Sequence, residues 1–251
     1  MLFMLIFKLS DSDINVHPKN GRLIDLSGIN GTSCYCDEAA KAEIRAKIEA
    51  EIQAEMPSSR PRINLIDCGD YHYMTAILCE PINEPFSLVL FDHHPDMQSP
   101  AFGDVLSCGG WVRTMLENHP FLRKVLIIGI NPELSCETEG FPGRVTVIDK
   151  VASESAALSE IQKWQPEGKL YISIDKDVLS KEFATTDWDQ GDMSIHTLLK
   201  LIEACMALPH KGLIAVDICG GMPISKGGTP KNTSLNSIAD KAIIDLINQR
   251  Y

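Results

Sequence analysis

Two hydrophobic patterns alternate along the chain. Short, continuously apolar runs recur, and between them lie stretches in which apolar residues return every three or four positions. Runs without polar alternation are typical of strands covered on both faces, whereas a return every three to four residues is typical of amphipathic helices. Strands are therefore predicted in the opening MLFMLIFKLS and at 62–67, 87–91, 124–130, 144–148, 169–174 and 212–217.

The clearest helical pattern lies between residues 37 and 56. Apolar side chains return there at every fourth position, and Pro57 closes the run, as is common beyond the end of a helix. The residues between the first strand and this helix are predicted to form a polar loop. Further helices are predicted at 72–80, 109–118, 153–164, 194–207 and 235–249.

The order of these elements predicts the fold class. Strands and helices alternate to the end of the chain, which favours an α/β fold: a three-layer α/β/α sandwich with a mostly parallel central sheet and right-handed crossovers. The 251 residues contain no internal repeat and no Pro/Gly-rich linker. A single domain over residues 1–251 is therefore predicted.

Composition narrows the possible partners and the compartment. The chain carries 34 acidic and 23 basic side chains, a net charge of −11, and shows no basic patch, so no nucleic-acid partner is expected. No apolar stretch approaches the roughly 20 residues of a membrane span, and the first residues lack the basic region and cleavage site of a signal peptide. The eight cysteines form no CxxC pair, which indicates free thiols in a reducing, cytoplasmic environment.

Candidate chemistry gathers where the predicted strands end. His72 follows the strand at 62–67, and Asp217 ends the strand at 212–217. The predicted strand at 87–91 is followed by DHHPD, at 92–96, and the predicted strand at 169–174 by DKD, at 175–177. Working sites of open parallel sheets lie beyond the carboxyl ends of the strands. These side chains are therefore expected at one edge of the sheet.

The spacing within these motifs indicates a metal centre. Alternate residues of an extended segment share a face, so Asp92, His94 and Asp96 can point together, as can Asp175 and Asp177. Such a cluster of carboxylates is repulsive unless protons or cations neutralise it. Carboxylates mixed with imidazoles, and without thiolates, suit Mn²⁺, and with His72 the set is large enough for two ions. Each motif alone would also suit a helix cap or a solvated turn.

The motifs resemble those of the ureohydrolases, the family of arginase, agmatinase and formimidoylglutamase. The matching segments are GDYHYMT (69–75), DHHPD (92–96), SIDKDVL (173–179) and AVDICGG (215–221), in the family's order. The resemblance implies an arginase-like fold and two Mn²⁺ per chain. One ion would be held by His72, Asp92, Asp96 and Asp175, and the other by Asp92, His94, Asp175 and Asp177.

The resemblance also implies a mechanism. A hydroxide bridging the two metals would attack a guanidinium or formimino carbon, and Asp96 would pass its proton to the leaving amine. Asp217 would pair with a small cationic or amidino substrate through charge-assisted hydrogen bonds. Trp188, in the segment TTDWDQGDMS, is a further candidate for substrate contact. Relatives form trimers and hexamers, so a homo-oligomer is a possible assembly.

Several departures from the family pattern argue against arginine as the substrate. One extra residue precedes His72, and the segment LSCGGWVRT (106–114) offers no histidine where arginase has a proton shuttle. The late acid is Asp217 where a glutamate is usual. The sequence therefore predicts a hydrolase of C–N bonds in another guanidino or amidino compound. A zinc-dependent amide hydrolase on a related, deacetylase-like fold and a non-enzymatic metal-binding protein remain alternatives.

Overall fold

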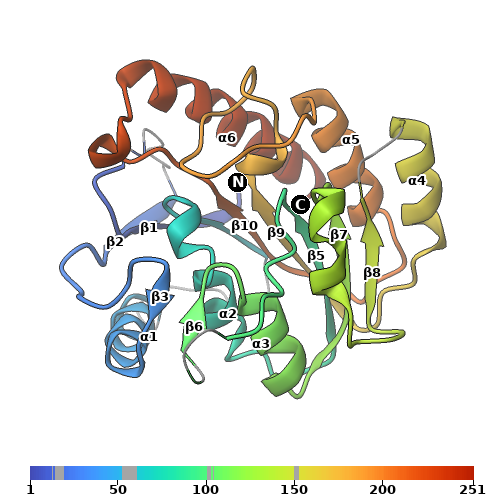
Figure 1. Ribbon diagram of the computed structural model, residues 1–251, viewed down its shortest axis with the longest axis horizontal. Coiled ribbons are helices and arrows are strands. Elements are labelled where there is room, and N and C mark those ends of the chain that lie inside the picture. Colours follow the sequence, from blue (N-terminus) through green and yellow to red (C-terminus); the bar gives the residue numbers. More distant parts are fainter. Residues whose placement is uncertain (13, 15–19, 53–60, 101–102, 104, 150–152) are drawn as a thin grey trace.

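The central feature of the computed structural model is one eight-stranded sheet (Figure 1). The structure describes residues 1–251 except 13, 15–19, 53–60, 101–102, 104 and 150–152. Its strand order is β2-β1-β4-β10-β9-β5-β7-β8, and every neighbouring pair is parallel. The strands are β1 (Phe3–Lys8), β2 (Gly21–Asp25), β4 (Arg62–Leu65), β5 (Phe86–Phe91), β7 (Leu122–Ile128), β8 (Val145–Ile148), β9 (Lys169–Asp175) and β10 (Leu213–Cys219).

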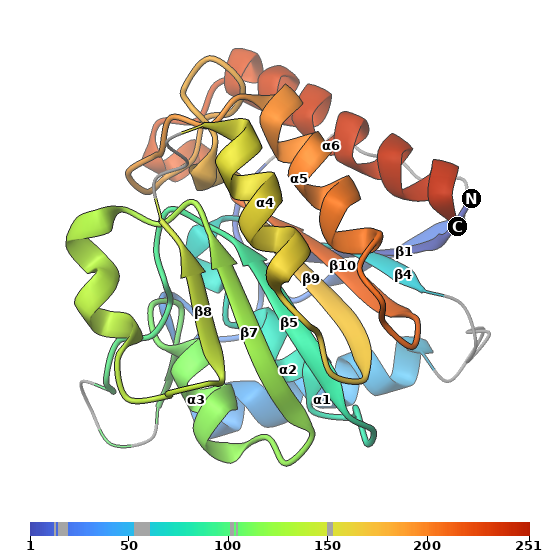
Figure 2. The ribbon, with the colours of Figure 1, turned by 90° about the vertical axis from the view of Figure 1, so that its right-hand side faces the viewer.

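Helices cover both faces of this sheet, which gives three layers (Figure 2). One layer contains α1 (Glu38–Ile52), α2 (Met74–Cys79) and α3 (Trp111–Asn118), and the other contains α4 (Glu154–Lys163), α5 (Ile195–Met206) and α6 (Pro230–Arg250). Successive residues of a strand enter opposite layers: Leu5 and Phe7 lie in one apolar cluster, Met4 and Ile6 in the other. The predicted three-layer α/β/α fold is confirmed, and burial on both faces explains the continuously apolar runs.

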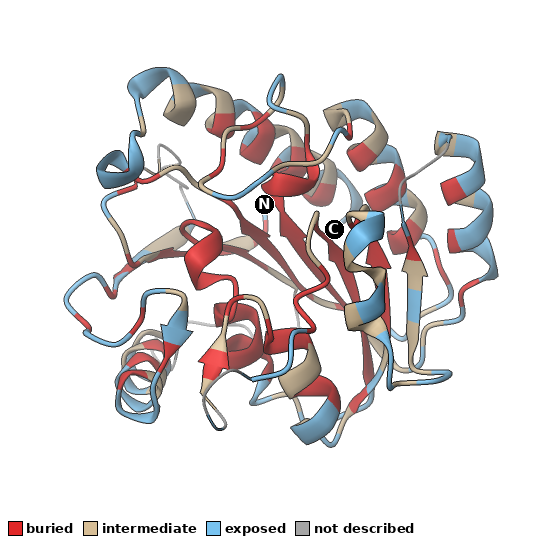
Figure 3. Cartoon of the chain, in the orientation of Figure 1, coloured by how far each residue is buried: buried red, intermediate tan, exposed pale blue. Residues whose placement is uncertain are grey.

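The burial of the chain follows the same layers (Figure 3). Buried residues run through the strands and along the inner sides of the helices, while the outer sides of the helices are exposed. Among the helices that the structure describes, none is both long and apolar enough to cross a membrane.

Three strands were not predicted, because unlike the central strands they have no continuous apolar run. The segment before α1 was expected to be a loop, yet it contains β2, an edge strand in which Ile24 alone is buried. An edge strand with one covered position has no continuous apolar run to reveal it. The other two, β3 (Tyr35–Cys36) and β6 (Leu106–Ser107), form a separate antiparallel pair.

The predicted helices all occur, with different ends. The end of the first one, at 53–56, lies outside the described residues. The last one begins at Pro230, before the predicted start at 235, because Thr229 and Asn232 form a capping box there. Polar capping residues carry no apolar periodicity, so the hydrophobic pattern could not mark this start.

Candidate metal centre

Strand register brings the two predicted metal motifs together. β5 and β9 are neighbours in the sheet, and Phe91 pairs with Ile174. The residues that follow, Asp92 and Asp175, therefore lie side by side at the carboxyl edge of the sheet. The 3-10 turn η3 (Lys176–Val178) then carries Asp177. His72 comes from the end of another turn, η1 (Gly69–Tyr71), which follows β4.

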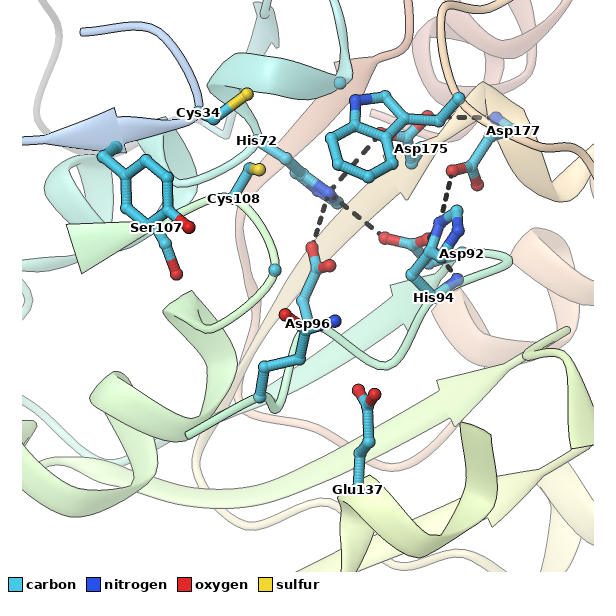
Figure 4. A pocket seen from close by; sticks show the side chains of 15 residues that line it. Cys34, His72, Asp92, His94, Asp96, Ser107, Cys108, Glu137, Asp175 and Asp177 are labelled. Carbon is cyan, nitrogen blue, oxygen red and sulfur yellow. Dashed lines mark hydrogen bonds and ion pairs between the residues drawn. The ribbon is translucent and has the colours of Figure 1, made fainter. Parts of the chain in front are cut away.

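All six predicted ligands line one cavity of about 230 Å³ (Figure 4). The ring nitrogen Nδ1 of His72 lies 3.1 Å from Asp92 Oδ2, 3.0 Å from Asp96 Oδ2 and 3.5 Å from Asp175 Oδ2. All four side chains are buried. One imidazole nitrogen thus faces three buried carboxylates.

A second cluster shares Asp92 with the first. His94 Nδ1 lies 2.8 Å from Asp177 Oδ2 and 3.6 Å from Asp92 Oδ1. Three groups of the described residues have ligand atoms within 4.8 Å of one another. Two of them belong to the predicted centre: His72, Asp92 and Asp96, and Asp92, His94 and Asp177; the third is Cys68, Asp70 and Asp187. Because Asp92 belongs to both groups of the predicted centre, its two oxygens could serve two adjacent ions.

The electrostatics of the cavity show how much these carboxylates need a cation. Burial and the neighbouring Asp92 raise the pKa of Asp96 to about 7 and that of Asp175 to about 6. Burial and Asp175 likewise raise the pKa of Asp177. Among the described residues that line the cavity, none is a lysine or an arginine. The cluster must therefore hold protons or metal ions, and its mixed oxygen and imidazole donors fit divalent ions such as Mn²⁺.

The backbone around the ligands is held in unusual conformations. Asp96 has a φ of +50°, a left-handed conformation that aspartate seldom adopts, and its Oδ2 accepts a hydrogen bond from the Trp111 indole. Gly220 has a φ of +95°, and a Cβ at this position would lie 2.6 Å from Asp175 Oδ1. Such constraints cluster at functional sites, where the surrounding fold compensates for their energetic cost.

Comparisons with known proteins agree with this geometry. A model of the arginase family matches residues 65–236, which include the whole cluster. The chain belongs to the arginase family. An uncharacterized protein of Thermotoga maritima is 29% identical over 159 residues, a match that spans 63% of this chain and 57% of that protein.

Solved structures of arginase-family enzymes share the fold. A hypothetical agmatinase from Burkholderia thailandensis has a TM-score of 0.69 at 17% identity, covering 99% of this chain and 86% of its own. The agmatine ureohydrolase of Thermoplasma volcanium gives 0.67 at 17%, covering 97% and 89%. The proclavaminate amidino hydrolase of Streptomyces clavuligerus gives 0.68 at 15%, covering 96% and 89%. At these identities the similarity establishes the fold alone.

The predicted ligand His72 is backed by a buried chain of hydroxyl groups. Its Nε2 lies 2.9 Å from Ser173 Oγ, and Ser173 Oγ lies 3.2 Å from Thr75 Oγ1. Thr75 Oγ1 in turn donates to Asp217 Oδ2 at 2.7 Å. If Nδ1 faces the metal, Nε2 carries the proton, and every hydroxyl in the chain can then donate toward Asp217. Such support fixes the tautomer and orientation of a metal-binding histidine.

The placement of Asp217 disagrees with its predicted role. Its side chain is fully buried, does not line the cavity, and accepts hydrogen bonds from Asn64, Thr75 and Tyr171. The prediction assumed that the strand ends at 217, but β10 continues to Cys219, which pairs with Asp175. Asp217 lies two residues below this edge, about 7 Å at the rise of a strand, and outside the lining of the cavity.

Trp188 lies where substrate contact was predicted. It lines the cavity, is 40% exposed, and donates from Nε1 to Asp70 Oδ1 at 3.2 Å. The same segment supplies Asp189, whose Oδ1 lies 2.9 Å from Nε2 of His94. Sequence reasoning did not assign Asp189 this contact, because no spacing rule links two residues that meet only across the mouth of a cavity.

A second acid escaped the sequence analysis. Glu137, in the 3-10 turn η2 (Pro132–Thr138), lines the cavity opposite the metal cluster (Figure 4). Its buried Oε2 has no hydrogen-bond partner among the residues that the structure describes, and burial raises the pKa of this carboxyl, while Gln98 and Arg113 oppose that rise. It lies well beyond the apolar run of β7, so a census restricted to strand ends could not find it.

Proposed function

We propose that this arginase-family protein is a hydrolase that uses two Mn²⁺ to cleave a C–N bond of a small guanidino or amidino compound other than arginine. The observation that carries the proposal is the convergence of His72, Asp92, His94, Asp96, Asp175 and Asp177 on one cavity. The two clusters, joined through Asp92, match the need of a two-metal site for a shared carboxylate.

The protein's own residues would hold the ions and manage the proton. His72, Asp92, Asp96 and Asp175 would hold one ion, and Asp92, His94, Asp175 and Asp177 the other. When bound, two divalent cations would lower the pKa of a bound water to near 7, so that hydroxide forms at neutral pH. Asp96 is the proposed proton carrier, because its carboxyl belongs to the first cluster and the Trp111 indole fixes its orientation.

The cavity also supports a cationic substrate. Apart from the ligands, its one charged wall residue among those described is Glu137, whose carboxyl interacts with Gln98 and Arg113 but whose buried Oε2 accepts no hydrogen bond from the described residues. We assign to Glu137 the cation-pairing role first predicted for Asp217, since a guanidinium or amidinium can satisfy a carboxylate with paired N–H donors. Trp188 would cover the opposite side of the cavity mouth. The names of the similar structures, agmatinase and proclavaminate amidino hydrolase, support the same class of compound.

The test is product release from Mn²⁺-loaded protein. Urea or ammonia would be measured with arginine, agmatine, guanidinobutyrate, formimidoylglutamate and free guanidine as substrates. We expect turnover of one compound, lost in Asp177→Asn and retained in Asp245→Asn, a matched change of an exposed aspartate on α6. Full activity of the Asp177→Asn protein would contradict the proposed metal set.

Metal analysis separates the remaining alternatives. About two Mn²⁺ per chain is expected. One tightly bound Zn²⁺, together with hydrolysis of acetylated amines, would favour the amide-hydrolase alternative, because such sites use a single metal. Two bound metals with no consumption of any guanidino or amide compound would favour a metal-binding protein without catalysis.

A further inference from the structure

Cys34 and Cys108 face each other at one end of the small β3–β6 sheet. Tyr35 pairs with Ser107 and Cys36 with Leu106, so continuing the register places Cys34 opposite Cys108. The backbone confirms this continuation, because Cys108 N donates to Cys34 O at 2.9 Å. Cys34 lies just before β3 and has a φ of +56°, so this backbone hydrogen bond, rather than regular strand geometry, holds the two cysteines opposite each other. Directly opposed residues of an antiparallel pair have Cα atoms about 4.5–5.5 Å apart, and a disulfide spans roughly 4.4–6.8 Å.

Both side chains belong to the wall of the metal cavity (Figure 4). They lie on the same side of it, next to His72, and are contributed by segments that are far apart in the sequence. Cys34 is half-buried and Cys108 is buried. A small oxidant that enters the cavity therefore reaches Cys34 with Cys108 already behind it.

The contact between the two thiols shifts their pKa values in opposite directions. The interaction between the two thiols lowers the pKa of Cys34, and the same interaction, together with burial, raises that of Cys108. A thiol with a lowered pKa, partial exposure and a second thiol in contact has the properties of an oxidation-sensitive site. Neighbouring Cys36 differs: burial raises its pKa to about 11, and its side chain lies in the core beneath the sheet.

We propose that Cys34 and Cys108 are a site of reversible oxidation, at which a hydroperoxide converts the two thiols to a disulfide in the cavity wall. The Cys34 thiolate attacks the peroxide, the O–O bond breaks, and an alcohol or water leaves with Cys34 as a sulfenic acid. Cys108 then attacks the Cys34 sulfur, the S–O bond breaks, and its proton leaves with the hydroxide as water. Two electrons pass from the two sulfurs to one peroxide.

The proposal goes beyond the hydrolase activity and does not depend on it. The disulfide would join residues 34 and 108 beside His72 and remove both thiol hydrogens from the cavity wall. Its formation can therefore be followed on the protein alone, whether or not any substrate is known.

The test is oxidation of the full-length, reduced protein with equimolar hydrogen peroxide. We expect intact mass to fall by about 2 Da, for the two hydrogens lost, and dithiothreitol to restore it. Non-reducing digestion should yield one cross-linked peptide pair, containing Cys34 and Cys108. Cys136→Ser, which removes the exposed cysteine of η2, should react like the parent.

Two single variants assign the steps. Cys108→Ser should stop at the sulfenic acid of Cys34, trapped by dimedone, while Cys34→Ser should react at least about tenfold more slowly and form no disulfide. Circular dichroism would confirm that both variants are folded. Consumption of Cys136 before Cys34, or peroxide oxidation of Cys34 to sulfinic acid with Cys108 still reduced in the parent, would overturn the proposal.

Discussion

At the scale of single residues, the orientation of His72 depends on an atom outside the cavity. Its Nε2 faces Ser173 Oγ. Ser173 Oγ contacts Thr75 Oγ1, and Thr75 Oγ1 donates to Asp217. Asp217, at the end of this chain, also accepts hydrogen bonds from Asn64 and Tyr171, which fix its carboxylate in place. We infer that Asp217 serves the metal centre as a positioning residue through His72.

Replacing Ser173 with alanine should weaken metal binding. The change removes the acceptor for the His72 Nε2 proton, and loss of such support typically lowers metal affinity about 10–100-fold. Titration of the metal-free protein with Mn²⁺ would measure the effect. Ser87→Ala is the matched control, because Ser87 is an equally buried serine of the adjacent β5 whose hydroxyl bonds to Glu167 instead. Equal Mn²⁺ affinity in the two variants would refute the role.

At the scale of elements, the turn η3 is attached to α6 by one buried ion pair. Lys176 lies between the predicted ligands Asp175 and Asp177, and its side chain turns away from the cavity to place Nζ 2.6 Å from Asp240 Oδ1. The two side chains are 6% and 10% exposed. The pair therefore links α6 to the backbone between Asp175 and Asp177.

Lys176→Met should destabilise the protein by about 3–5 kcal/mol, because Asp240 would be left buried without its partner. Urea denaturation would measure the loss. The double variant Lys176→Met/Asp240→Leu should recover much of it, since replacing a whole buried pair with apolar side chains costs little. If the double variant is no more stable than the single one, the unpaired carboxylate is not the cause.

The start of α6 offers a milder test at the same scale. Thr229 accepts from Asn232 N in the capping box, so Thr229→Ala should reduce stability by about 1 kcal/mol. Thr233→Ala provides the control one turn further on, where the hydroxyl bonds back to a helix carbonyl. A loss in the control equal to that in Thr229→Ala would show that capping is not responsible.

At the scale of the whole molecule, the buried carboxylates make the stability of the metal-free protein depend on pH. The pKa values of Asp96 and Asp175, about 7 and 6, are raised above the roughly 3.9 of an unfolded chain. Between pH 4 and 7 the folded protein therefore binds more protons than the unfolded chain. His72 and His94 have raised pKa values too and act in the same direction at higher pH.

The unfolding free energy of the metal-free protein should accordingly fall as pH rises from about 4 to 7. Urea denaturation at several pH values in the presence of a chelator would measure the trend. Saturating Mn²⁺ should flatten or reverse it, because metal displaces the same protons. Asp96→Asn should reduce the slope, since it removes one of these protons. A metal-free protein that gains stability over this range would contradict the assignment.

Much of the fold could be predicted because it rests on local patterns. A strand covered on both faces must be apolar throughout, so β5 and β9 could be recognised from composition alone. The edge strand β2 has no such requirement and was missed. Ends of elements depend on single hydrogen bonds, such as the cap at Thr229, and these leave little trace in hydrophobicity.

The sequence by itself determined the layers of this protein and the residues that end β5 and β9, because strand periodicity and acidic motifs are local properties. Tertiary structure alone decided where Asp217 and Glu137 lie relative to the cavity. The length of β10 buried Asp217, and the packing of η2 turned Glu137 into the cavity. The β3–β6 pairing likewise set Cys34 against Cys108. Each of these contacts joins residues distant in sequence, and their distance is set by how strands align, not by spacing along the chain.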